Sequence, residues 1–144
     1  MDKIDLYVHT DIRTTKRSAG CYIYILEYQT QKGPATLTGK ATHIEDATFL
    51  RAELVAINEG LKRLKRPVSV VIHAEGHMLI LALQNKWFET WQSRGWENSK
   101  GEDIDCLEDW QEFTELMKDN ELITATKDKH SYLSWMAGEC ERAV

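Results

Sequence analysis

A helix-forming stretch followed at once by a short apolar run is the feature that most constrains this fold. One apolar stripe recurs at helical spacing and predicts a helix over about 47–65. The stripe consists of Leu50, Leu54, Ile57, Leu61 and Leu64. Asp46 is the expected N-cap, and the helix should end before Pro67. Residues 68–74 form a short apolar run of the kind found in buried parallel strands. A helix over about 47–65 followed by a buried parallel strand over 68–74 therefore indicates an α/β fold.

The first third of the chain has a different pattern. Residues 4–9 alternate between apolar and polar side chains, which predicts a half-buried strand. Residues 20–29 are rich in β-branched and aromatic side chains, which favour a second strand. Gly33 and Pro34 then turn the chain into a third strand near 35–42. Three successive strands joined by turns predict an antiparallel meander.

The remainder of the chain continues the alternation of helices and strands. Helical segments are expected over about 77–95 and 104–118, a fifth strand over 121–126 and a closing helix over 131–142. We therefore predict an α/β domain with a mixed five-stranded sheet: three antiparallel strands, then βα units, with helices on both faces and the first strand central. The length of 144 residues suits a single domain covering 1–144.

Composition narrows the setting of the protein. The three cysteines, Cys21, Cys106 and Cys140, are widely spaced and odd in number, which argues against a disulfide framework and against a zinc site. No stretch approaches the apolar length of a membrane span, and the N-terminus shows no signal-peptide pattern. A cytoplasmic protein without a membrane partner is expected. The net charge of −5 means that nucleic acid would have to be bound through a local basic patch.

The order of elements resembles that of the ribonuclease H-like fold, and three motifs carry the resemblance. Arg51-Ala52-Glu53-Leu54 lies in the first long helix, where ribonucleases H carry an Arg-x-Glu-Leu-type motif. Val71-Ile72-His73-Ala74-Glu75 ends the fourth strand, where the family has its next carboxylate. The tryptophan-rich stretch from Trp87 to Gln111 resembles the handle region of cellular type 1 ribonucleases H. The chain thus looks like a divergent type 1 ribonuclease H.

The resemblance implies a chemistry and a set of residues. Ribonucleases H cut the RNA strand of an RNA–DNA hybrid with two divalent ions, held by four acidic side chains on different elements. Glu53 matches the helix glutamate, and Glu75 stands at the fourth-strand aspartate position, one methylene longer. The first-strand aspartate falls at His9, with Asp11 as the alternative if the strand end is bulged. These four residues are candidate catalytic positions.

The fourth acid of the family has no counterpart in this chain. His130 matches a histidine of the family's late loop, but Trp135 or Met136 stands near where the following aspartate belongs. Glu139 and Glu141 are poor replacements because they lie further along the expected helix. His130 is therefore the only late residue among the candidate catalytic positions.

A reduced carboxylate set has consequences for metal binding. The candidate ligands are Glu53, Glu75 and His9, which supply two negative charges instead of four. Imidazole suits softer ions than Mg²⁺, so Mn²⁺ would be preferred if His9 is a ligand. The expected cofactor is Mg²⁺ or Mn²⁺, bound weakly or not at all.

Two segments are candidates for contact with nucleic acid. The family's glycine-rich loop after the first strand is replaced here by a polar loop with cationic side chains, Arg13, Lys16 and Arg17. The handle region offers Trp87, Trp91, Arg94 and Trp96. This handle is less basic than the family's, and its tryptophans would serve equally well as core residues.

Three functions remain open from the sequence. The chain could be a divergent ribonuclease H with an altered metal site, which the positions of Glu53 and Glu75 favour. It could be an inactive relative that still binds RNA–DNA hybrid or structured nucleic acid, which His9 and the absent fourth acid favour. It could also be a protein-binding module, for example an inhibitor of a nucleoprotein enzyme, which the negative charge and the weakly basic handle favour.

Overall fold

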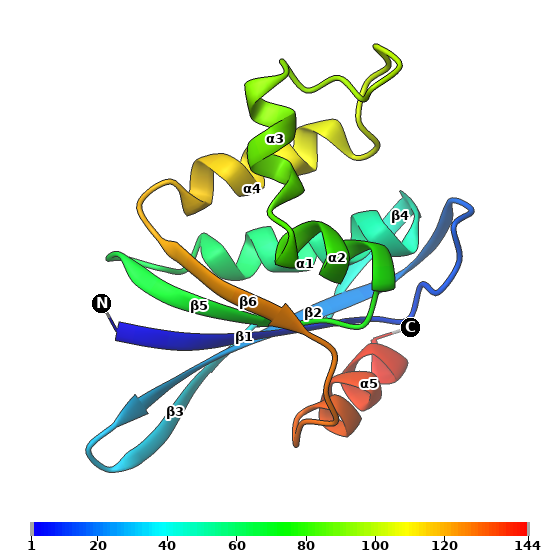
Figure 1. The fold of residues 1–144 in the computed structure, drawn as a ribbon. Helices are drawn as coiled ribbons and strands as arrows, with labels where there is room; N and C mark the ends of the chain where they lie inside the picture. Colours follow the sequence, from blue (N-terminus) through cyan, green and yellow to red (C-terminus); the bar gives the residue numbers. More distant parts are fainter. Residues whose placement is uncertain (1, 144) are drawn as a thin grey trace.

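The computed structural model describes residues 2–143 and shows a mixed six-stranded sheet (Figure 1). Its strands are β1 (Asp2–Thr10), β2 (Ser18–Thr30), β3 (Gly33–Thr38), β4 (Thr42–Ala47), β5 (Val68–His73) and β6 (Glu121–Thr126). They run in the order β3-β2-β1-β5-β6, with β4 also paired to β2. The β1–β2, β2–β3 and β2–β4 pairs are antiparallel, whereas β5 pairs in parallel with β1 and β6. The α/β class and the central position of the first strand are confirmed.

Helices cover the sheet on both faces. They are α1 (Phe49–Leu61), α2 (His77–Gln84), α3 (Trp87–Ser93), α4 (Leu107–Met117) and α5 (Leu133–Arg142). Figure 1 shows α1 and α2 on one face, with α3 and α4 forming a further layer above them, and α5 alone on the other face. The central strand therefore contributes to two cores.

The alternation of β1 divides its side chains between these cores. Leu6 and Val8 face the larger core under α1, where both are fully buried. Tyr7 faces the smaller core, which α5 closes with Met136 and Cys140. Burial of apolar side chains on both faces, at about 25 cal/mol per Å², makes β1 the strand on which the two layers depend.

The sheet has one more strand than the five predicted. The expected third strand near 35–42 corresponds to β3, which ends at Thr38, and the additional strand β4 over Thr42–Ala47 was not predicted. Strand β2 is 13 residues long, so different parts of it pair with β3 and with β4. A Cβ atom on Gly39 would lie 2.4 Å from the Tyr24 ring, so the connection between β3 and β4 needs a residue without a side chain at this position.

The start of α1 differs from the prediction. Thr48, and not Asp46, caps α1: its side chain accepts a hydrogen bond from the backbone amide of Arg51. Strand β4 continues through Ala47, and Asp46 has a φ of +53°, so the helix begins later than predicted. The helical segments expected over 77–95 are the two helices α2 and α3, which are separated at Lys86, where the backbone is left-handed with a φ of +51°.

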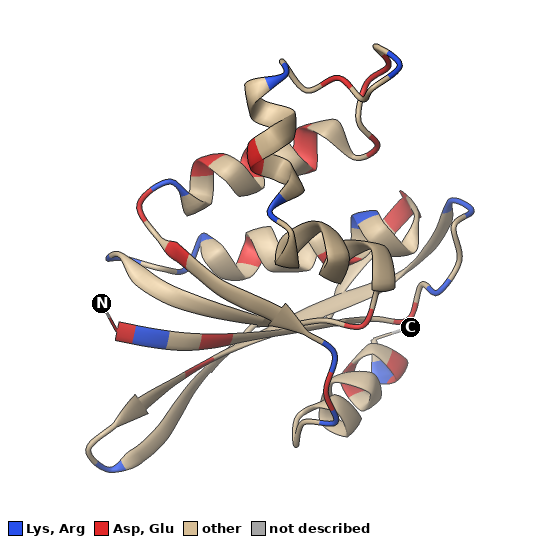
Figure 2. Cartoon of the chain, viewed as in Figure 1, with Lys and Arg blue, Asp and Glu red and all other residues tan. Residues whose placement is uncertain are grey.

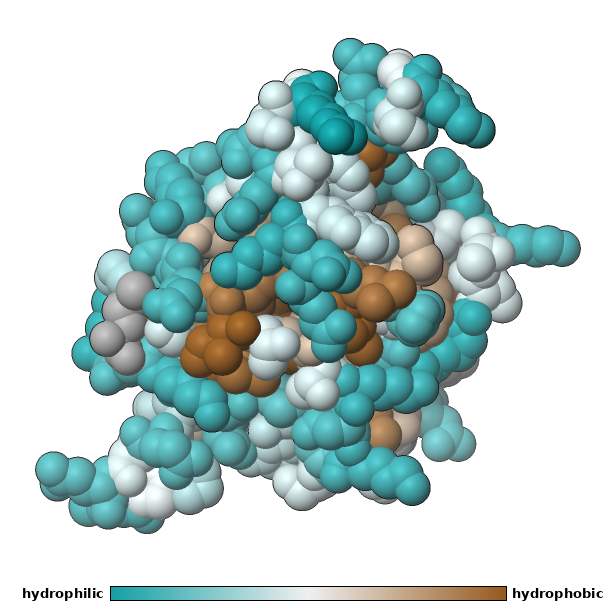
Figure 3. Space-filling model, in the orientation of Figure 1, coloured by the Kyte–Doolittle hydropathy of each residue, from teal (hydrophilic) through white to brown (hydrophobic). Residues whose placement is uncertain are grey.

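The surface gives two further observations. Figure 3 shows apolar surface on the face where β6 and α2 lie in Figure 1, and Ile123 and Met78 are large apolar side chains exposed on these elements. Strand β6 is an edge of the sheet, and its pairing with β5 shifts register between Val70 and Val71. Within residues 2–143, no helix is long and apolar enough to cross a bilayer.

Candidate active site

The candidate site lies where β1 and β5 end and α1 passes beside them. The structure brings together His9 from the end of β1, Arg13 from the following loop, Glu53 from α1 and Glu75 from the turn after β5. We call these four residues the Glu75 cluster. Parallel strands that end at the same edge of a sheet commonly place their sites there, and here that edge joins β1 to β5.

Glu53 is the buried member of the cluster. Its side chain is completely buried, and its two carboxylate oxygens accept hydrogen bonds from the backbone amides of Glu75, at 2.8 Å, and Gly76, at 2.9 Å. Burial raises the pKa of Glu53 to about 7, although the two amide hydrogen bonds act in the opposite direction. A Cβ atom on Gly76 would lie 2.3 Å from Glu53 Oε1, so this close approach requires glycine.

Glu75 is the charged centre of the cluster. Nδ1 of His9 lies 2.8 Å from Glu75 Oε1, and Nη2 of Arg13 donates to the same oxygen at 2.9 Å. Burial alone would raise the pKa of Glu75, but the hydrogen bonds from His9 and Arg13 and the positive charge of Arg13 outweigh it and hold the pKa at about 2. Glu75 is therefore ionised at neutral pH and paired with a cation.

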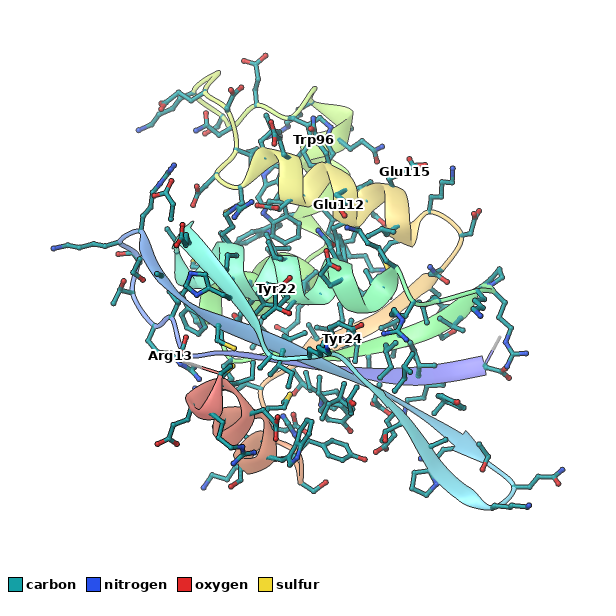
Figure 4. The ribbon with its side chains drawn as sticks, turned by 180° about the vertical axis from the view of Figure 1, so that it is seen from behind. Arg13, Tyr22, Tyr24, Trp96, Glu112 and Glu115 are labelled. Atoms are coloured by element: carbon teal, nitrogen blue, oxygen red, sulfur yellow. The ribbon has the colours of Figure 1, made fainter. Side chains whose placement is uncertain are left out.

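Arg13 reaches the cluster from a loop that is tied to the start of α1. The backbone amide of Phe49 donates to Thr14 O at 2.9 Å, which ties the loop to the start of α1. The Arg13 guanidinium lies 5.1 Å from the centre of the Phe49 ring, within range of a cation–π interaction. Its Nη2 also lies 3.2 Å from His9 Nδ1. Figure 4 shows Arg13 beside the loop that follows β1, well away from Trp96 in the layer formed by α3 and α4.

Asp11 takes a different position from His9. Its carboxylate accepts a hydrogen bond from the backbone amide of Cys21 at 2.9 Å, which joins the end of β1 to β2. Gly20 makes room for this contact, since a Cβ atom there would lie 2.4 Å from Asp11 Oδ1. Of the two alternatives for the first-strand position, the structure places His9 in the Glu75 cluster and leaves Asp11 outside it.

His130 lies next to a second group of polar residues. Its ring packs 4.5 Å from that of Tyr7, and its Nδ1 accepts a hydrogen bond from the backbone amide of Tyr132. Burial lowers the pKa of His130, and the charges of Glu75 and His9 also act on it. The predicted late histidine is thus near the Glu75 cluster, although no direct hydrogen bond between them is recorded among residues 2–143.

The same neighbourhood holds residues that were not among the predicted site residues. His73 is buried between two carboxylates, with Nε2 2.8 Å from Asp5 and Nδ1 2.9 Å from Asp128. Its ring stacks on Tyr7 at 4.1 Å. Asp5 was detectable only as a polar position in an alternating strand, and Asp128 as one charge in a polar loop. These contacts attach the loop before α5 to the central strands.

The tryptophans of the handle pack against one another and the core. Trp91 lies 6.3 Å from Trp87 and 5.3 Å from the buried Trp110, ring centre to ring centre. Trp96 is partly buried against the same core and has a positive φ of 67°. Arg94 is an exposed residue at the end of α3. The structure therefore places the predicted handle residues in a layer separate from the Glu75 cluster.

The other two cations of the first loop point into solvent. Lys16 and Arg17 are exposed, and Arg17 pairs with Asp46 at 3.1 Å across the surface. An exposed pair of this kind contributes at most about 1 kcal/mol, so Arg17 is available to other anions. Together with Arg13, these residues give the loop three positive charges.

The Glu75 cluster as arranged does not fit a pair of divalent ions. Both oxygens of Glu53 are occupied by backbone amides, and Glu75 is neutralised by a guanidinium instead of facing an ion. Mg²⁺ requires several oxygen ligands in near-octahedral geometry. Within residues 2–143, no group of three or more His, Cys, Asp or Glu side chains is arranged to hold a metal ion.

Comparison with known sequences establishes the family. A sequence model of the RNase H family matches residues 4–131, and the chain belongs to this family. Ribonuclease H of Caldicellulosiruptor saccharolyticus is 36% identical over 74 residues, covering 51% of this chain and 51% of that protein. Ribonuclease HI of Helicobacter pylori is 30% identical over 112 residues, covering 78% of this chain and 71% of that protein. The chain spans about half the length of the first of these curated relatives.

Comparison with solved structures confirms the fold. LC9-RNase H1, a type 1 RNase H with the type 2 active-site motif, superposes with a TM-score of 0.75 at 17% identity, over 99% of this chain and 72% of that one. The foamy viral protease-reverse transcriptase in complex with RNA/DNA hybrid gives a TM-score of 0.64 at 14% identity, over 97% of this chain and 19% of that one. At these identities the likeness concerns the fold alone.

Proposed function

We propose that this chain binds RNA–DNA hybrid at the Glu75 cluster and cleaves it slowly or not at all. Membership of the RNase H family supports the class of ligand. A solved protein with the same fold is described in complex with RNA/DNA hybrid. The first loop supplies the local positive charge that an acidic protein needs at such a surface, through Arg13, Lys16 and Arg17.

One observation supports the proposal that cleavage is slow or absent: the Arg13 guanidinium lies 2.9 Å from the Glu75 carboxylate. Two-ion hydrolysis depends on carboxylates that attract and orient the ions. Here one carboxylate is neutralised by Arg13, and the other has both oxygens bonded to the backbone. His9 stands where the family has an aspartate and adds no negative charge. The cluster therefore lacks the electrostatic field that hydrolysis requires.

The experiment is a paired measurement on a labelled RNA–DNA hybrid. Binding is measured by fluorescence anisotropy, and cleavage by gel electrophoresis with Mg²⁺ and with Mn²⁺. We expect specific binding together with cleavage at least about 10²-fold slower than that of a ribonuclease H with the full carboxylate set. Glu53→Gln is the control for trace contamination, because any genuine residual cleavage should disappear in it. Rapid cleavage by the unaltered chain would contradict the proposal.

A protein-binding role is the second candidate, and the charge of the outer helical layer favours it. Figure 2 shows acidic positions along α4, and Figure 4 places Glu112 and Glu115 on this helix. Glu112 pairs with Lys62 at 2.8 Å, but Glu115 pairs only within its own helical segment, with Lys118. Such a surface would repel a nucleic-acid backbone and suit a basic protein partner, such as a nucleoprotein enzyme that the chain inhibits. Absence of hybrid binding would make this role the leading one.

Several earlier predictions remain to be tested within this proposal. Weak binding of Mg²⁺ or Mn²⁺ by Glu53, Glu75 and His9 stays a prediction, checked by calorimetric titration without nucleic acid; tight binding of two Mg²⁺ ions would contradict it. The roles of Trp87, Trp91, Arg94 and Trp96 in binding nucleic acid also stay predictions. The cytoplasmic setting rests on the pattern of the three cysteines, which are unpaired in the described residues.

A further inference from the structure

We propose that Arg13, positioned by Glu75, forms a phosphate-binding site for the nucleic-acid backbone that works without a metal ion. This inference rests on the proposed function and specifies how the ligand is held. The usual site of the family brings phosphate to the protein through ions, whereas here a fixed cation occupies the same corner of the sheet. The ligand class is a phosphodiester.

The position of Arg13 is set by contacts on three sides. Glu75 accepts a hydrogen bond from Nη2, the Phe49 ring lies against the guanidinium, and the amide of Phe49 holds the carbonyl of the neighbouring Thr14. An arginine held in one orientation loses less conformational entropy when it binds an anion than a mobile one does. The site is therefore preorganised.

Arg13 also retains donors for a ligand. Its side chain is 42% exposed, and within residues 2–143 its hydrogen bond to Glu75 comes from Nη2, which also lies 3.2 Å from His9 Nδ1. Nε and Nη1 remain for phosphate oxygens, and the planar guanidinium can donate two parallel hydrogen bonds to them. Arg13 can thus hold the Glu75 carboxylate through Nη2 and bind phosphate through its remaining donors.

The charge of the cluster permits a phosphate to approach. The Glu75 carboxylate lies 2.9 Å from the Arg13 guanidinium, so its negative charge is balanced by that of Arg13. Glu53 is buried away from solvent. Lys16 and Arg17 add exposed positive charge from the same loop. With Glu75 paired to Arg13 and Asp46 paired to Arg17, Lys16 and the solvent-facing part of the Arg13 guanidinium are the cationic groups that a phosphodiester would meet at this loop.

The test measures hybrid binding by fluorescence anisotropy in EDTA and in Mg²⁺, over a range of salt concentrations. For the unaltered chain we expect the same Kd within about twofold in both conditions. Arg13→Gln should weaken binding by about tenfold or more, since a hydrogen bond to a charged group is lost. It should also reduce the slope of log K against log salt by about one. Arg13→Lys keeps the positive charge but loses the planar pair of guanidinium donors. Its affinity for the hybrid should therefore lie between that of the unaltered chain and that of Arg13→Gln.

Two controls separate folding from binding. Arg66→Gln removes an exposed arginine that pairs with Asp2 at the opposite end of the sheet, and should leave binding unchanged. Arg13→Gln combined with Glu75→Gln avoids an unpaired carboxylate, so its binding loss cannot be attributed to misfolding if its thermal unfolding matches that of the unaltered chain. The double variant should bind as weakly as Arg13→Gln.

The outcomes distinguish this inference from the proposed function. Hybrid binding that requires Mg²⁺, or that is unaffected by Arg13→Gln, would overturn the phosphate site and leave the proposed function standing. Absence of hybrid binding under every condition would overturn both. Binding in EDTA that depends on Arg13 and not on Arg66 would support the inference.

Discussion

Glu53 accepts a hydrogen bond from the backbone amide of Glu75 at 2.8 Å, so one acidic residue of the cluster fixes the main chain of the other. The contact joins α1 to the turn that follows β5, the next strand along the chain. It also gives the two carboxyl groups opposite environments: one is buried among amides, and the other is paired with Arg13.

The first prediction concerns the pH dependence of stability. Burial raises the pKa of Glu53 from 4.5 to about 7, so between these values the folded chain binds a proton that the unfolded chain does not. The contribution of Glu53 to the free energy of unfolding should therefore fall as pH rises through this window, by about 3 kcal/mol in total. Urea denaturation of the unaltered chain and of Glu53→Gln from pH 4 to pH 8 measures the difference. The exposed Glu45→Gln variant should follow the unaltered chain. A stability of the unaltered chain that stays constant or rises with pH relative to Glu53→Gln would refute the assignment.

The second prediction concerns the charge on Glu75. Its pKa of about 2 is held down, against burial, by His9 and Arg13. Arg13→Gln should raise the pKa of Glu75 by about 1–2 pH units, because an opposite charge in contact is removed. Carboxyl carbon chemical shifts followed by NMR against pH give the value directly. Arg17→Gln is the matched control, since Arg17 pairs with Asp46 instead, and an unchanged Glu75 in Arg13→Gln would show that the ion pair does not form in solution.

The third prediction concerns restoration of hydrolysis. His9→Asp supplies a carboxylate at the end of β1, and Glu75→Asp shortens the second carboxylate to the family's length. The structure adds a third requirement, because Arg13 would still neutralise the shortened side chain. The triple variant with Arg13→Ser should cleave the RNA strand with Mg²⁺ about 10²–10³-fold faster than the unaltered chain. The double variant with His9→Asp and Glu75→Asp, which keeps Arg13, should show a smaller increase in the cleavage rate.

Loss of this gained activity in a further Glu53→Gln change would tie it to the cluster. A triple variant that folds and remains inactive would mean that the missing fourth acid, near Met136, is also needed.

The fourth prediction concerns the layer formed by α3 and α4. Trp110 is 1% exposed and lies within 6.3 Å, ring centre to ring centre, of Phe88, Trp91 and Phe113. Trp110→Ala should lower the free energy of unfolding by about 3–5 kcal/mol, measured by urea denaturation. Trp135→Ala, at a residue 42% exposed on α5, should change it by less than about 1 kcal/mol. Equal effects would mean that the two layers do not pack as described.

The sequence predicted the helices and strands of this molecule better than their ends and the loops between them. The alternation of β1 and the apolar stripe of α1 are periodic signals, and the meeting of His9, Glu53 and Glu75 follows from elements that end at one edge of the sheet. Strand β4 was missed because its formation depends on how the long strand β2 is shared between two partners.

The ends of elements and the loops carried weaker signals. Asp46 and Thr48 are both good N-cap residues, and only the pairing of β4 up to Ala47 decides between them. Arg13 was predicted to contact nucleic acid, but its place beside Glu75 depends on the path of a polar loop that has no periodicity. Side-chain contacts between distant segments are set by the tertiary fold and leave no local pattern.

The register shift between β5 and β6 has a consequence for association between molecules through the edge of the sheet. Strand β6 has six residues and forms a free edge of the sheet, where unpaired backbone groups could recruit a strand from another molecule. A bulge opposite Val70 and Val71 interrupts the ladder beside this edge, and bulges increase local twist. A short, twisted edge is a poor template for intermolecular strand addition, so the irregularity works against aggregation at high protein concentration.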